Sequence, residues 1–83
     1  MFGAKDRLIT IRGLIIPVNW DERGKVTAIA ASTFDEEEYL LDYNKKIDRL
    51  FPLIQKEVEV TGYVRKEKGK KIMTVKKFHL KRA

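Results

Sequence analysis

The hydrophobic residues of this chain recur at two different spacings, and the change of spacing outlines its secondary structure. Residues 8–18 and 26–33 are rich in β-branched side chains, and the polar segment 19–25 (NWDERGK) lies between them. Two such runs around a turn that contains a glycine predict a β-hairpin. Gly13 interrupts the first run, so we expect a long strand that bends there, and Pro17 limits pairing near its end.

A short third strand and one helix are predicted in the middle of the chain. Residues 39–43 (YLLDY) alternate enough for a strand and follow the acidic connection 34–38. The spacing then becomes helical after Asn44, which can cap a helix. The apolar stripe of this helix consists of Ile47, Leu50, Phe51 and Ile54. Pro52 predicts that the helix is short or broken.

Two further strands are predicted in the last third. Residues 56–66 alternate strictly, and residues 72–80 form the partner strand after the turn EKGKK. A slip of one residue near Lys76 and Lys77 would let the apolar side chains on both sides of it face inward. The inward residues are then Val58, Val60, Gly62, Val64, Met73, Val75, Phe78 and Leu80.

The order of elements is three strands, one short helix and two strands in a single domain, residues 1–83. Five short strands bury their apolar faces best by curling into a barrel, with the helix plugging one end. Residues 8–80 resemble the OB-fold superfamily, in particular its small bacterial domains, in the bent first strand, the turn DERGK, the segment LIQKEVEVTGYV and the hairpin KEKGKKIMTV. Gln55 departs from the glycine common in that pattern. An SH3-like barrel is the nearest alternative, but it has no helix at this place.

The resemblance implies an all-β fold, a five-stranded OB-like Greek-key barrel with one short helix between strands 3 and 4. It also implies a binding surface on strands 2 and 3, flanked by the loop between strands 1 and 2 and the loop between strands 4 and 5. Because a fold does not fix a function, each candidate residue is weighed by its own chemistry.

Composition narrows the classes of protein and locates the charge. The chain has 43% hydrophobic and 36% charged residues and no cysteine, which favours a soluble domain without disulfides or a cysteine zinc site. We see no signal peptide or membrane span and expect a cytoplasmic monomer. Residues 1–55 carry a net charge of −1 and residues 56–83 carry +7, so the excess positive charge lies in the last third.

Basic side chains near aromatic rings are what single-stranded nucleic acid needs, because cations attract phosphates and bases stack on rings. We therefore predict weakly sequence-specific binding of single-stranded DNA or RNA through the lysine-rich hairpin between strands 4 and 5. The candidate residues are Trp20, Arg23, Lys25, Tyr63, Arg65, Lys66, Lys68, Lys70, Lys71, Lys76 and Lys77.

Other interpretations of this hairpin stay open. Lysines on exposed hairpins also discourage aggregation, and the same hairpin could dock an acidic protein partner or the acidic run 35–38 of a second copy. Catalysis has little support, since Ser32 has no sequence-local base and His79 has no partner for a metal shell. We therefore expect a noncatalytic binding module without cofactor or metal.

Overall fold

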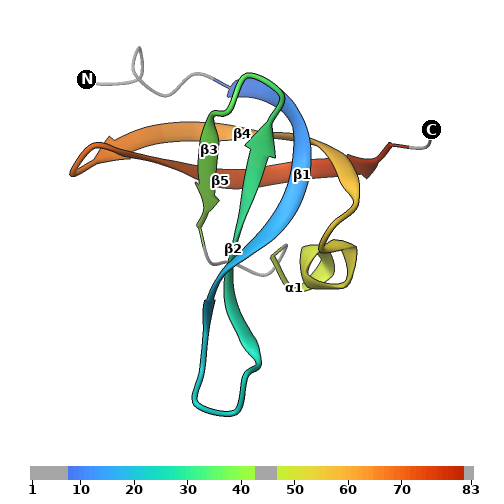
Figure 1. The fold of residues 1–83 in the computed structure, drawn as a ribbon. Coiled ribbons are helices and arrows are strands. Elements are labelled where there is room, and N and C mark those ends of the chain that lie inside the picture. Colours follow the sequence, from blue (N-terminus) through green and yellow to red (C-terminus); the bar gives the residue numbers. More distant parts are fainter. Residues whose placement is uncertain (1–7, 43–46, 82–83) are drawn as a thin grey trace.

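Five β-strands form a closed barrel in the computed structural model, which describes residues 8–42 and 47–81 (Figure 1). The strands are β1 (Leu8–Trp20), β2 (Val26–Thr33), β3 (Glu38–Leu41), β4 (Glu57–Glu67) and β5 (Lys70–Leu80). They are hydrogen-bonded in the order β1-β2-β3-β5-β4, with β4 returning to β1 and only the β3–β5 pair parallel. The short helix α1 (Ile47–Leu50) and the 3-10 turn η2 (Phe51–Leu53) lie between β3 and β4. The predicted all-β, five-stranded barrel with one short helix is confirmed.

β1 pairs with two neighbouring strands, and the change of partner lies near Gly13. Residues 8–14 of β1 pair with β4, and residues 13–20 pair with β2, so Gly13 belongs to both ladders. A Cβ atom at Gly13 would lie 2.7 Å from the carbonyl carbon of Ser32, too close for any other residue type without movement of the backbone. β1 therefore changes neighbours near Gly13, and it continues past Pro17 to Trp20 with register shifts between Pro17 and Trp20.

Side chains from the strands and from α1 together form the core inside the barrel. Ile47 and Leu50 of α1 are buried, whereas Phe51 and Ile54 are half-buried and pack against the core. Pro52 falls in the first turn of η2, where α1 has already ended, as predicted. The fully enclosed side chains are Ile15, Ile29, Ile47, Leu50, Val58, Val60, Met73 and Val75. Asn44 and Tyr43, predicted as helix cap and strand residue, lie outside the described residues.

A β-bulge interrupts the pairing of β4 with β5. Thr61 pairs with Lys77 and Gly62 pairs with Val75, so Lys76 is the additional residue and the predicted slip is confirmed. Phe78 is half-buried and packs against the core. Leu80 pairs with the buried Val58 and so lies on the inner face, as predicted, but it is 43% exposed and does not join the enclosed core. Leu80 ends β5, whose pairing with β3 covers only residues 71–73.

The third strand is shorter than predicted and runs from Glu38 to Leu41. Leu41 is buried and Tyr39 is half-buried against the core, so Tyr39 contributes to packing. In the described part of the chain, no helix has the length and apolar character needed to cross a membrane.

Candidate nucleic-acid interface

The structure divides the predicted site residues into three groups. The loop cluster consists of Trp20, Arg23 and Lys25, beside the β1–β2 turn. The hairpin tip consists of Lys66, Lys68, Lys70 and Lys71, around the β4–β5 turn, and the outer hairpin face consists of Tyr63, Arg65, Lys76 and Lys77. The β1–β2 turn and the β4–β5 turn extend from the barrel in different directions (Figure 1). The loop cluster is therefore a separate surface from the two groups on the β4–β5 hairpin.

Asp21 organises the loop cluster. Its carboxylate accepts hydrogen bonds from the backbone N–H groups of Arg23 and Lys25, both at 2.9 Å. Gly24 closes the turn at a φ of 86°, where a residue with a side chain would be strained. Trp20 is 53% exposed, so it does not close the end of the barrel. The ordered loop leaves the Trp20 indole at the surface, in a hollow that it lines together with Asp21, Glu22, Arg23 and Lys25, so two carboxylates balance the two cations.

A groove of about 490 Å³ lies between the base of the β1–β2 hairpin and the hairpin tip. Its lining residues are Val18, Asn19, Ala28, Glu37, Glu38, Leu40, Gly69, Lys70 and Lys71. This is the surface on β2 and β3, flanked by two loops, that the sequence resemblance implies. Its two carboxylates balance its two lysines, so the groove has no net positive charge to attract phosphates.

Lys71 is engaged within the chain. Its ammonium donates a hydrogen bond to the Glu37 carboxylate and lies 5.2 Å from the centroid of the Tyr39 ring. The hydrogen bond with Glu37 is the main reason that the pKa of Lys71 is raised. The acidic run therefore meets the lysine-rich hairpin inside one molecule, through Glu37 and Lys71.

Arg65 is also engaged within the chain. Its guanidinium bonds to the carboxylates of Glu67 at 2.7 Å and Asp42 at 3.0 Å. These contacts, the hydrogen bond to Glu67 first, raise the pKa of Arg65. Because Nε and Nη1 already bond to carboxylates, these two nitrogens stabilise the hairpin itself, and only the remaining donors of Arg65 are open to a phosphate.

Five lysines of the hairpin remain exposed and make no ion pair with another described residue. They are Lys66, Lys68, Lys70, Lys76 and Lys77 and are called the exposed lysines below. The bulge places Lys76 5.8 Å from the centroid of the Tyr63 ring, which is 36% exposed. Leu8 of β1 pairs with Tyr63 and is 54% exposed, so an apolar side chain extends the surface beside the ring.

Sequence reasoning missed Leu8, because its place beside Tyr63 comes from pairing between strands far apart in the chain.

His79 is exposed on β5, opposite Glu59. Within residues 8–42 and 47–81, no three His, Asp or Glu side chains gather as a metal site would require. Comparisons with protein-family models, with curated proteins and with solved structures found no match to this chain.

Proposed function

We propose that this chain is a noncatalytic module of the OB-fold type that binds single-stranded DNA or RNA along its β4–β5 hairpin. The closed order of five strands, the parallel β3–β5 pair and the helix between β3 and β4 support the resemblance to the OB-fold superfamily. The observation that carries the function is the set of exposed lysines, which keep their charge free after the internal ion pairs have formed.

The exposed lysines suit a flexible polyanion. From Lys70 to Lys77 an extended strand covers about 23 Å at a rise of about 3.3 Å per residue, enough to follow several phosphates of a single strand. Tyr63 offers a ring on which one base can stack once Lys76 moves to a phosphate. Lysine ammonium groups act as point charges and lack the planar, bidentate geometry of arginine, so binding should tolerate many sequences and weaken with salt.

The test is the salt dependence of binding, measured by fluorescence anisotropy with a labelled single-stranded oligonucleotide. Five lysine–phosphate contacts predict a slope of about −3.5 in log Kobs against log[salt], since each contact on a single strand contributes about −0.7. The double variant Lys76→Gln/Lys77→Gln should reduce the magnitude of the slope by about 1.4.

The matched control is Lys56→Gln/Lys81→Gln, which changes the net charge equally but lies beyond the strands of the hairpin, since Lys56 precedes β4 and Lys81 follows β5. This control should leave the slope nearly unchanged. An absence of binding at low salt, or an equal loss of slope in the two double variants, would contradict the proposal.

A second candidate is an accessory domain that docks an acidic protein on the same lysines. The contact of Lys71 with Glu37 favours this candidate, because a lysine of the hairpin already binds a carboxylate there. Titration with polyglutamate separates the candidates. Tighter binding of polyglutamate than of an oligonucleotide of equal charge would favour the acidic protein partner.

A further inference from the structure

Phe34 is the most exposed large apolar residue of the described chain, with 79% of its surface accessible. It lies in the turn between β2 and β3, directly before the acidic run 35–38. Burying an aromatic side chain of this kind removes 150–250 Å² from water, so covering Phe34 would be favourable. A single exposed apolar residue is ordinary at a surface, and its significance depends on how the chain holds it.

The turn that carries Phe34 is firmly held by Thr33. The Thr33 N–H donates to the Glu37 carbonyl at 2.9 Å, and the Glu36 N–H donates to the Thr33 carbonyl at 3.1 Å. The Thr33 hydroxyl accepts a bond from the Glu37 N–H at 3.1 Å and donates to the Asp35 carboxylate. The contact of Glu37 with Lys71 ties the turn to β5. A ring on an ordered turn loses little conformational entropy when it binds.

The charges around Phe34 select the kind of partner. Asp35, Glu36 and Glu38 follow Phe34 in the chain, and their negative charge would repel the phosphates of a nucleic acid. A protein surface with an apolar cavity and a cation at its edge would complement both the ring and the carboxylates. Phe34 is therefore suited to a partner different from the one proposed for the exposed lysines.

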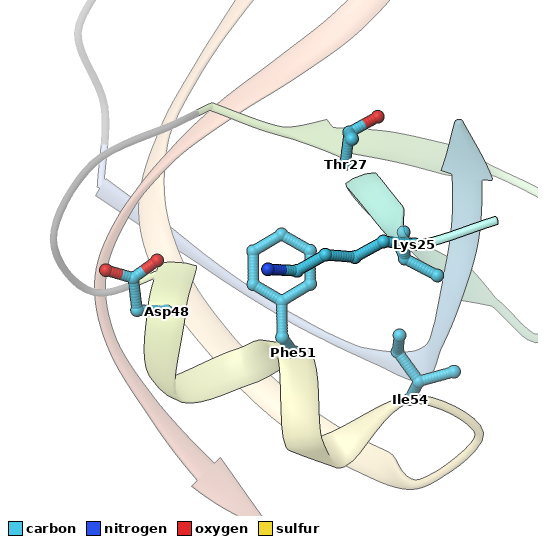
Figure 2. Close-up of a pocket in the computed structure, with 6 residues that line it drawn as sticks. Lys25, Thr27, Asp48, Phe51 and Ile54 are labelled. Carbon is cyan, nitrogen blue, oxygen red and sulfur yellow. The ribbon is translucent and has the colours of Figure 1, made fainter. Parts of the chain in front are cut away.

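The chain itself carries such a cavity, of about 580 Å³, between the start of β2 and the segment α1–η2. Val26, Phe51 and Ile54 supply its apolar wall. Figure 2 shows Lys25 reaching in from the β2 side and Asp48 projecting from α1. The cavity exceeds in volume an apolar cavity of about 150 Å³ that accepts benzene, so there is room for a phenyl ring.

We propose that Phe34 of one copy inserts into this cavity of a second copy, with the carboxylates of its turn beside Lys25. The ring and the cavity are different surfaces, so the contact is head-to-tail and builds short chains or a ring. One aromatic anchor makes a small interface, and such interfaces are weak. The chain would therefore remain a monomer when dilute and associate when concentrated. This association does not depend on the proposed nucleic-acid binding.

Sedimentation velocity on the full chain, from about 10 μM to about 1 mM, tests the contact. The average mass should rise with concentration, and Phe34→Ser should weaken the association about tenfold or more. The matched control Tyr63→Ser alters an exposed aromatic residue on another surface and should leave the association unchanged. Circular dichroism checks that both variants are folded. A mass that stays monomeric, or an unchanged association of Phe34→Ser, would overturn the proposal.

Charge changes at the cavity give predictions of opposite sign. Lys25→Glu should weaken the association, and Asp48→Asn should strengthen it because a carboxylate that repels the incoming turn is removed. Adding Glu36→Lys to Lys25→Glu should restore part of the loss. If both cavity variants change the association in the same direction, or if Lys76→Gln/Lys77→Gln abolishes it, the Phe34 contact is wrong.

Discussion

Gly62, beside the bulge of β4 and β5, has no room for a side chain. A Cβ atom at Gly62 would lie 2.9 Å from the carbonyl carbon of Thr74 and 3.2 Å from Val75 Cα, and closer still to the Thr74 carbonyl oxygen. Ordinary contacts begin at 3.4 Å, and the atoms in the way belong to the backbone. Gly62→Ala would therefore force β5 away from β4.

We expect Gly62→Ala to lower the free energy of unfolding by about 3 kcal/mol, because forced overpacking costs about 1–3 kcal/mol and each lost backbone hydrogen bond about 1 kcal/mol. For a chain of this length the whole free energy of unfolding is about 4–12 kcal/mol. Urea unfolding followed by circular dichroism measures the difference. With an m-value of about 1 kcal/mol/M, the midpoint should fall by about 3 M.

Gly69→Ala is the matched control on the same hairpin. Gly69 has a φ of 81° but nothing within 4 Å of a Cβ, so alanine meets only backbone strain of about 1 kcal/mol. If Gly69→Ala proved as costly as Gly62→Ala, close packing at the bulge could not be the reason that position 62 holds glycine.

Other predictions concern the core and the acidic turn. Met73→Ala should cost about 2–5 kcal/mol, since Met73 is fully buried, whereas Leu80→Ala at the exposed strand end should cost less than about 1 kcal/mol in the same urea assay. Equal costs would show that Leu80 is packed in solution. The hydrogen bond from Thr33 lowers the pKa of Asp35, so this contribution to stability is full above pH ~4 and is lost as pH falls through the folded-state pKa. Thr33→Val should raise that pKa in a carboxyl NMR titration, and an unchanged midpoint would refute the assignment.

Local patterns were sufficient for most of the fold. The alternation of 56–66 placed Val58 and Val60 inside, the adjacent Lys76 and Lys77 indicated the bulge, and Pro52 indicated the short helix. Leu80 lies on the predicted face but is exposed, and this difference has a physical cause. Alternation predicts the face on which a side chain lies, but whether another element covers that position depends on the length of the neighbouring strand.

The candidate site was less predictable, because charge counts do not show which charges pair. Arg65 and Lys71 looked equivalent to the exposed lysines in the sequence. Their partners, Asp42 and Glu37, precede them by 23 and 34 residues and reach them only because β3 lies beside β5. A parallel pairing of this kind leaves no local signal. The cavity beside Phe51 likewise depends on how α1 and η2 sit against β2.

The bulge at Lys76 keeps the core-facing side chains of β5 on one face of the sheet before and after it. Val75 and Phe78 both pack against the core although two residues separate them, because the bulge takes up the additional residue. The side chains at 76 and 77 point to solvent and can be exchanged for other polar residues at little cost. Deleting either residue would remove the bulge and restore ordinary alternation, which also leaves Val75 and Phe78 on one face. At this place the bulge lets the domain carry one additional residue without turning its core side chains outward.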